Sequence, residues 1–229
     1  MNLSGKVLVV TGSGGVLGQA VGAVLRDRGA TLALIDHAPA PAAQTPGTFR
    51  YGGIDLTLED AARAVMERIV RDAGRLDGLI NVAGGFRWEK LAGGTLEGWD
   101  SMYRINLRTA VVACQAALPF LLQAGAGRIV NVGAMAAAKA AVGMGAYAAS
   151  KAGVAKLTEA LADELKDRGI TVNAILPSTL DTPKNRLDMP GADFTRWVTP
   201  ADAAEVIAFL VSDAARAVTG ALIPVVGRT

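Results

Sequence analysis

The sequence predicts an α/β fold: a doubly wound, seven-stranded parallel sheet with helices on both faces, in a single domain of residues 1–229. Short apolar runs rich in β-branched residues alternate along the chain with longer stretches whose apolar residues recur at helical spacing. A glycine-rich segment separates the first such run from the first helical stretch. The 229 residues are 51% hydrophobic, which is enough apolar surface for one sizeable core.

The expected elements follow in regular order. Strands are predicted at 6–11, 31–35, 49–52, 78–82, 127–132, 171–176 and 221–225, and helices at 16–28, 57–73, 96–123, 146–168 and 200–212. Two connections, 37–48 and 179–199, are long, and both follow the carboxyl ends of strands. Ligands of open α/β sheets bind at that edge, so 179–199 is predicted to be a substrate loop, with a plain surface loop as the alternative.

Composition excludes several classes of function. Lys and Arg number 23 against 21 Asp and Glu, without a concentrated basic face, so no nucleic acid partner is expected. One cysteine, Cys114, and one histidine, His37, are too few for an internal disulfide or a histidine-rich metal site, so no metal is expected. The first residues do not resemble a leader, and no apolar run reaches the roughly 18 residues of a membrane span. We therefore expect a cytoplasmic protein without a membrane partner.

The glycine-rich segment at 11–18 predicts a dinucleotide site, because it follows a strand and opens a helix whose amino terminus can bind a diphosphate. Asp36 ends the second strand, where its carboxylate would accept hydrogen bonds from a ribose and repel a 2′-phosphate. This favours NAD(H) over NADP(H). A tight turn without ligand, and a helix cap at Asp36, are the alternatives. The turn residues expected to contact the cofactor are Gly12, Ser13, Gly14, Gly15, Val16, Leu17 and Gly18.

Tyr147 and Lys151 form a candidate acid–base pair. They are four residues apart on a predicted helix and share a face, where the ammonium would lower the tyrosine pKa and let it give or take a proton. The alternative is a buried tyrosine beside a lysine that reaches solvent. Asn106 lies within a mostly apolar helical stretch, where its amide requires hydrogen-bonding partners.

Together these residues resemble the short-chain dehydrogenase/reductase family over nearly the whole chain. The matching motifs are the glycine turn, Asn-Val-Ala-Gly at 81–84, Asn106, Tyr-Ala-Ala-Ser-Lys at 147–151 and the Pro-x-x-x-x-Thr stretch at 177–182. The resemblance implies a Rossmann-type fold, an NAD(H)-dependent oxidoreductase and a water held by Asn106 near Lys151. It also implies cofactor contacts at Asp55, Leu56, Asn81, Val82, Ala83, Gly84, Tyr147, Lys151, Pro177, Thr179 and Thr182.

Two positions depart from the family pattern. Val16 replaces a glycine of the turn, which is a minor change. Ala134 stands where the family has its catalytic serine, and a methyl group donates no hydrogen bond. Loss of one such donor typically costs ~10²–10³ in rate, so an unactivated ketone is expected to be a poor substrate. Ser150 is expected to face away from the pair, whereas Ser178 or Thr179 would replace the donor if their loop folds back.

The missing serine directs the substrate prediction. One branch of the family, the dihydropteridine reductases, also lacks it and has a similar loop at 176–197. A quinonoid dihydropteridine is already electrophilic and needs less polarisation than a ketone. The alternatives are a carbonyl or 3-oxoacyl reductase with a substitute donor, and a catalytically silent NAD-binding sensor. The residues expected to meet a small-molecule substrate are Phe86, Ala134, Arg186 and Trp197, with Trp88 as either a further wall or a core plug.

The long helices at 96–123 and 146–168 carry more apolar surface than one sheet face can cover. The resemblance implies that they pair between subunits, which predicts a homo-oligomer, either a dimer or a tetramer. The alternative is a monomer that buries both faces internally.

Overall fold

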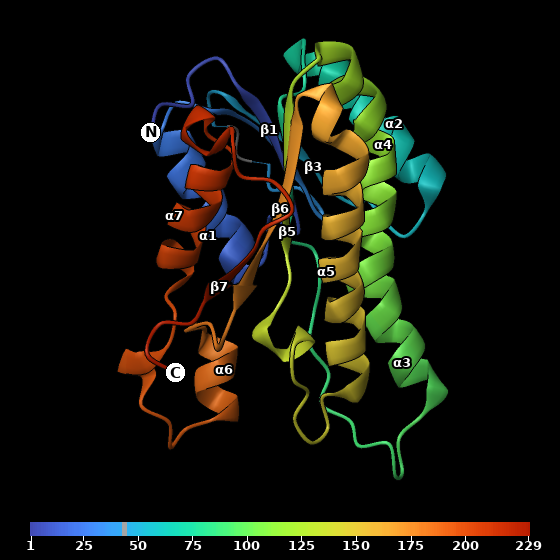
Figure 1. Ribbon diagram of the computed structural model, residues 1–229, viewed down its shortest axis with the longest axis vertical. Helices are drawn as coiled ribbons and strands as arrows, with labels where there is room; N and C mark the ends of the chain where they lie inside the picture. Colours follow the sequence, from blue (N-terminus) through green and yellow to red (C-terminus); the bar gives the residue numbers. More distant parts are fainter. Residues whose placement is uncertain (43–44) are drawn as a thin grey trace.

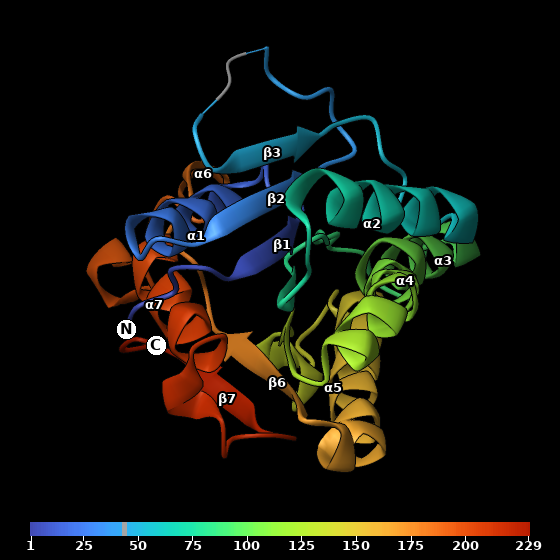
Figure 2. The same ribbon diagram turned by 90° about the horizontal axis from the view of Figure 1, so that it is seen from above.

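The computed structural model describes residues 1–42 and 45–229 and contains one parallel sheet of seven strands in the order β3-β2-β1-β4-β5-β6-β7 (Figures 1 and 2). The chain moves outward from β1 in one direction to β3, then crosses to β4 and moves outward in the other direction. The strands are β1 Val7–Thr11, β2 Thr31–Ile35, β3 Thr48–Tyr51, β4 Gly78–Asn81, β5 Gly127–Val132, β6 Ile170–Pro177 and β7 Leu222–Val225.

Helices cover both faces of the sheet. The α-helices are α1 Val16–Asp27, α2 Glu59–Ala73, α3 Leu96–Met102, α4 Thr109–Ala124, α5 Gly145–Leu165, α6 Pro183–Asp188 and α7 Pro200–Leu210. Figure 2 shows α1 and α7 on one face and α2, α4 and α5 on the other. Two apolar clusters follow this division: Val21 of α1 packs with Ile207 of α7, and Met66 of α2 packs with Leu121 of α4.

The strands are buried because helices lie over both of their faces. All five residues of β1 and all eight of β6 are buried, including Thr171 and Asn173 of β6, so neither strand alternates between buried and exposed residues. Gly74 and Gly125 end α2 and α4 with φ of 82° and 67°, a left-handed conformation that glycine adopts without steric cost. The sheet and the helices on both faces confirm the predicted fold class.

Two predicted segments contain structure that the pattern did not indicate. The stretch predicted as one helix at 96–123 contains a π-helical part, Tyr103–Arg108, between α3 and α4. The predicted loop 179–199 contains α6 and a 3₁₀ turn, Phe194–Arg196. Helix α6 begins where it does because the Thr182 side chain accepts a hydrogen bond from the Asn185 amide and Pro183 occupies the first turn.

The continuous helical stretch Leu96–Ala124 is long and apolar enough to span a membrane by length and composition, with a mean hydropathy of 1.5 over its most apolar window. This differs from the expectation that no segment reaches that length. Core helices of soluble proteins also meet the criterion, and α4 packs against α2 and the sheet here. The absence of a membrane partner stays a prediction.

Candidate active site

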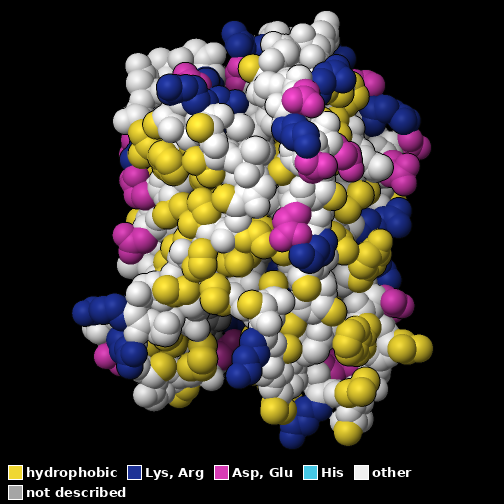
Figure 3. All heavy atoms as spheres, in the orientation of Figure 1, with side chains coloured by type: hydrophobic (Ala, Val, Ile, Leu, Met, Phe, Trp, Pro, Cys, Tyr) yellow, Lys and Arg dark blue, Asp and Glu magenta, His cyan; other side chains and the backbone are white. Residues whose placement is uncertain are grey.

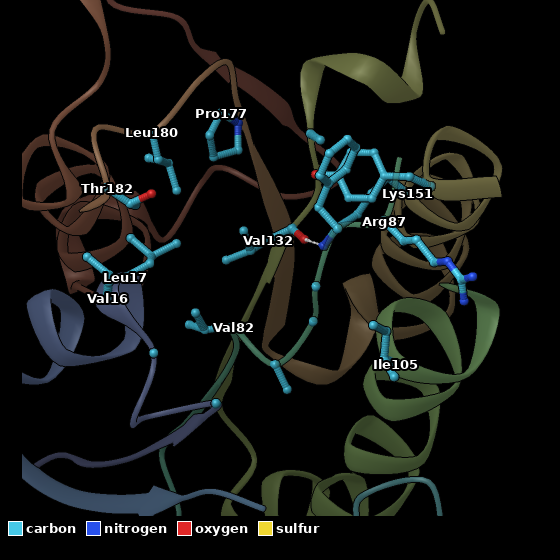
Figure 4. Close-up of a pocket in the computed structure, with 18 of the residues that line it drawn as sticks. Val16, Leu17, Val82, Arg87, Ile105, Val132, Lys151, Pro177, Leu180 and Thr182 are labelled. Atoms are coloured by element: carbon cyan, nitrogen blue, oxygen red, sulfur yellow. Dashed lines mark hydrogen bonds between the residues drawn. The ribbon is translucent and has the colours of Figure 1, made fainter. Parts of the chain in front are cut away.

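A cleft of about 1910 Å³ opens at the carboxyl edge of the sheet, where the strand order reverses between β1 and β4 (Figure 4). Figure 4 shows Val16 and Leu17 of α1 on one wall, Pro177, Leu180 and Thr182 beside them, and Val132 and Lys151 at the back. The predicted site residues that line it are Gly12, Gly15, Val16, Leu17, Gly18, Asp36, Asp55, Leu56, Val82, Ala83, Gly84, Phe86, Ala134, Tyr147, Lys151, Pro177, Thr179 and Thr182.

The glycine turn brings backbone close to backbone. Gly12 has φ of 64°, and a Cβ there would lie 2.7 Å from the Cα of Ala83. A Cβ on Gly18 would collide with the carbonyl oxygen of Gly12. Gly15 begins α1 without a side-chain cap, so the first amides of that helix have no partner from a capping side chain. An uncapped helix amino terminus at a glycine-lined cleft is suited to an anionic group such as a diphosphate.

Asp36 lies beside this turn with both carboxylate oxygens occupied by amides. Oδ2 accepts a hydrogen bond from the Gly14 amide at 2.7 Å, and Oδ1 accepts one from the Ala38 amide at 2.9 Å. These bonds hold the charge at the rim of the cleft. Ser13 and Gly14 line a smaller neighbouring cavity of about 520 Å³ instead of the main cleft.

Asp55 and Leu56 follow β3 and close this end of the cleft. The Asp55 Oδ1 accepts hydrogen bonds from the amide and hydroxyl of Thr57 at 2.8 and 2.7 Å, and these bonds lower the pKa of the Asp55 carboxyl. His37, the one histidine of the sequence, also lines the cleft here.

The segment after β4 is tied to β1. The amides of Val82 and Ala83 each donate to Thr11 Oγ1 at 3.2 Å. Asn81, predicted to contact the cofactor, does not line the cleft: its Nδ2 donates to Asn131 Oδ1 at 2.9 Å, inside the core. The difference arises because alternate residues of a strand point to opposite faces.

Asn106 lies in the π-helical segment, is 1% exposed and does not line the cleft. Its Oδ1 accepts a bond from the Gly85 amide at 2.9 Å, and its Nδ2 donates to the Gly85 carbonyl and to Ser150 Oγ, both at 3.0 Å. A Cβ on Gly84 would lie 2.5 Å from Asn106 Oδ1. Asn106 therefore fixes the backbone of the cleft wall, and its role in holding a water stays a prediction.

Tyr147 and Lys151 both line the cleft from α5, as their four-residue spacing predicts. The Lys151 ammonium donates to the Val132 carbonyl at 2.7 Å, and burial lowers the pKa of Lys151 to about 8 (Figure 4). Burial raises the pKa of Tyr147 to about 12. This is the opposite direction from the predicted lowering by Lys151, because the ammonium points to a carbonyl and the tyrosine is desolvated.

The position of the expected serine is apolar. Ala134 lines the cleft immediately after β5 with 6% of its surface exposed. Ser150 is turned away, as expected, and its hydroxyl donates to the Tyr147 carbonyl at 2.7 Å. Ser178 lines the cleft, but its hydroxyl donates to the Val226 carbonyl at 2.9 Å and accepts from Thr229 Oγ1 at 2.7 Å. Its single proton is therefore directed toward the chain terminus.

Aromatic side chains form one wall of the cleft. The Phe86 ring meets the Tyr147 ring edge to face, with centroids 5.0 Å apart. Trp88 is 56% exposed and lines the cleft, so it is a wall residue and not a core plug. The Glu89 amide donates to the Gly143 carbonyl at 2.8 Å, which joins this segment to the one before α5.

Two predicted substrate residues lie outside the cleft lining. Arg186 pairs with both carboxylate oxygens of Asp181, at 2.6 and 2.7 Å, and lies over the Phe194 ring. Trp197 is 8% exposed and packs on the same Phe194, with ring centroids 4.8 Å apart. These contacts hold the 179–199 loop together and correct the prediction that both residues face the substrate.

The sequence reasoning missed several residues of the cleft wall. Lys139 was overlooked because it is the lone charge in the alanine-rich stretch at 134–141, which carries no motif. Apolar residues of the cleft wall that lie in loops also belong to no motif, so the sequence did not indicate them as site residues. The cleft-lining residues that the sequence pattern did not indicate include Arg87, Lys139, Val142, Met144, Lys184 and Met189.

Comparison with known proteins gives a consistent result. The family model described as short chain dehydrogenase matches residues 6–190. A 3-oxoacyl-(acyl-carrier-protein) reductase of Thermotoga maritima is 33% identical over 242 residues, covering 99% of this chain and 98% of that protein. A D-threitol dehydrogenase of Mycolicibacterium smegmatis is 35% identical over 235 residues, covering 96% and 90%.

Solved structures show the same likeness. The 3-ketoacyl-(acyl-carrier-protein) reductase from Brucella melitensis complexed with NADH superposes with a TM-score of 0.89 at 27% identity, covering 99% of both chains. Carveol dehydrogenase from Mycobacterium avium in complex with NAD superposes with a TM-score of 0.87 at 27% identity, covering 98% and 97%.

Proposed function

The chain belongs to the short chain dehydrogenase family, and on this premise we propose that it is an NADH-dependent reductase of an electrophilic small molecule. The observation that carries the proposal is the juxtaposition in one cleft of an uncapped helix amino terminus, the Tyr147 hydroxyl and the apolar Ala134. The first suits a dinucleotide, the second supplies a proton, and the third limits which acceptor reacts.

The residues present fit a nicotinamide dinucleotide. Gly12 and Gly18 leave space that a Cβ would fill, and the start of α1 offers amides to a diphosphate. Asp36, held by two amides, would accept hydrogen bonds from the adenosine ribose. The cofactor supplies the hydride when bound. Two solved relatives named above are complexes with NAD and NADH, which supports a nicotinamide cofactor.

Tyr147 is the proton donor in this proposal. Its pKa of about 12 keeps the hydroxyl protonated at neutral pH, which is the state that reduction requires. Phe86 packs edge to face against its ring. Lys151 lies one helical turn away, and its ammonium would stabilise the phenolate left after proton transfer only if it turned from the Val132 carbonyl toward Tyr147. Asn106 fixes the Gly85 backbone of the cleft wall.

The acceptor is proposed to be an activated electrophile. Ala134 contributes no hydrogen bond and the Ser178 hydroxyl is committed to Val226, so neither residue helps Tyr147 to polarise an acceptor. A quinonoid dihydropteridine fits, because its ring needs little polarisation and its planar shape suits the wall formed by Phe86 and Trp88.

The second candidate is a carbonyl or 3-oxoacyl reductase. The relatives named 3-oxoacyl-(acyl-carrier-protein) reductase favour it. It requires a replacement donor: Thr179 lines the cleft, whereas Ser178 would serve only if its hydroxyl turned from Val226 toward the cleft.

The test is steady-state NADH oxidation with chemically generated quinonoid dihydropterin, beside a panel of simple ketones and diketones. The proposal predicts turnover of the activated acceptors, lost in Tyr147→Phe. Turnover of simple ketones that disappears in Ser178→Gly would support the second candidate. NADH binding without turnover of any acceptor would instead indicate a silent sensor.

The cofactor preference is also a proposal. The fixed Asp36 carboxylate would repel a 2′-phosphate, so we expect NADH to bind more tightly than NADPH. The measurement is the ratio of the two dissociation constants, in the native chain and in Asp36→Ser. Equal affinity of the native chain for both cofactors would contradict this assignment.

Assembly and location are also proposals. Leu96, Trp99 and Tyr103 on the outer side of the α3 segment are 83%, 40% and 52% exposed, which supports a homo-oligomer that covers them. Sedimentation velocity would test whether the chain forms a dimer or tetramer. A cytoplasmic location stays a prediction from the single buried cysteine.

A further inference from the structure

The charges that line the cleft are separated along the sheet. Asp36 and Asp55 follow β2 and β3, on one side of the glycine turn. Arg87 and Lys139 follow β4 and β5, on the other side. Arg104 lies near Asp55, and Asp188 lines the cleft beside Lys184, so neither end has charges of one sign only. Cations outnumber carboxylates among the residues that line the acceptor end, which favours an anionic ligand there.

Most cations at the acceptor end already have partners. Arg87 pairs with Glu89 at 2.7 Å, and Figure 4 shows its side chain extending away from Val132 and Lys151. Lys184 pairs with Asp188 at 2.9 Å. Arg104 pairs with Glu97 at 4.0 Å, and Lys151 donates to Val132. Among residues 1–42 and 45–229, the exposed Lys139 is the one cleft-lining lysine or arginine without an ion pair or a hydrogen bond to a protein acceptor.

The residues that line the same end of the cleft as Lys139 indicate what the uncharged part of the ligand is like. The side chains that share this end of the cleft are apolar or aromatic: Phe86, Trp88, Val142, Met144 and Met189. Figure 3 shows the hollow between α6 and the segment before α5, with Lys and Arg side chains on its rim. A planar apolar body with one anionic group would place its body on the aromatic wall and its charge at Lys139.

We infer that the substrate carries, on a substituent of its electrophilic ring, a carboxylate or phosphate bound by Lys139, so that Lys139 is a specificity-determining residue. An unsubstituted dihydropterin lacks this group and probes the reaction alone. The inference rests on the proposed function, because it takes this end of the cleft to be the acceptor site. The reacting atom lies beside Tyr147, and the anionic group lies toward the mouth. Lys139 takes no part in proton transfer.

The experiment measures binding without turnover, so that its failure and that of the proposed reductase are distinguishable. Three probes with one planar body are titrated by calorimetry into the protein saturated with NADH: 2-naphthoate, 2-naphthyl phosphate and the neutral 2-naphthamide. We expect one anion to bind up to about fivefold more tightly than the amide, the upper end of the range for a charge pair at an exposed site. Whichever anion binds more tightly identifies the group.

The variant Lys139→Gln should remove the preference for the anion and leave amide binding unchanged. The matched control is Lys156→Gln, which makes the same change in net charge at a site on α5 outside the cleft and should retain the preference. Equal affinity for anion and amide, or no detectable binding of either anion, would overturn the inference. So would a preference that survives in Lys139→Gln.

Discussion

The two ends of the cleft are built in different ways. The cofactor end is made of backbone and short side chains at the ends of β1, β2 and β4, with glycines where atoms approach most closely. The acceptor end is made of long side chains on the connections after β4, β5 and β6. The sheet fixes the first, whereas the second can change its side chains without disturbing the core. Differences of substrate between relatives of one fold are therefore expected at the acceptor end.

The largest effect is expected from a change at Tyr147, the proposed proton donor. Tyr147→Phe keeps the ring that packs on Phe86 but removes the hydroxyl, so we expect the turnover rate to fall by about 10²–10⁴ with the NADH dissociation constant unchanged. Single-turnover NADH oxidation and an NADH titration measure the two quantities. A variant with native turnover would remove Tyr147 from the mechanism.

A substitution in the glycine turn should act on the cofactor end alone. Gly18→Ala forces the new methyl into the Gly12 carbonyl, and we expect NADH binding to weaken by about 100-fold as the turn shifts. Gly22→Ala, one turn further along α1, is the matched control because its nearest atom is 3.8 Å away. The control should bind NADH normally and gain about 0.5–1 kcal/mol in stability. Similar weakening in both variants would show that α1, and not the turn, governs binding.

Lys151 should destabilise the protein that carries no cofactor. Its pKa is lowered from 10.5 to about 8 on folding, so between these values the unfolded chain binds one more proton and stability rises with pH. Below pH 8 Lys151 is charged in both states, so the folded chain bears the full free-energy cost of burying that charge. Lys151→Met should therefore raise the free energy of unfolding at pH 7 by up to about 3 kcal/mol, less the bond to Val132. Chemical denaturation of both proteins from pH 7 to 10.5 measures this. A native chain whose stability is flat over that range would contradict it.

The smallest effect is expected in the 179–199 loop. Arg186→Leu breaks the pair with Asp181 and the contact with Phe194, both at the surface, so we expect the melting temperature to fall by about 2 °C or less. NADH binding should not change. A large rise in the KM of the acceptor would restore the earlier interpretation of Arg186 as a substrate ligand.

The sequence predicts the cofactor end better than the acceptor end, for a physical reason. Gly12 and Gly18 are constrained by backbone geometry, and Tyr147 and Lys151 by helical spacing, so their positions follow from local pattern. Lys139 and Met144 come together only because the connections fold over the sheet edge, which no short pattern encodes. Trp197 and Arg186 were misplaced because Phe194 and Asp181 offer them closer partners within their own loop. The pKa of Tyr147 depends on burial, which spacing does not indicate.

Because Ala134 donates no hydrogen bond, the proposed acceptor must already be electrophilic. We would compare kcat/KM for quinonoid dihydropterin and for a simple ketone of similar size, in the native chain and in Ala134→Ser. We expect the native chain to prefer the activated acceptor strongly, and the added hydroxyl to raise only the ketone rate, by about tenfold or more. Equal rates on both acceptors in the native chain, or no effect of Ala134→Ser on the ketone, would contradict it.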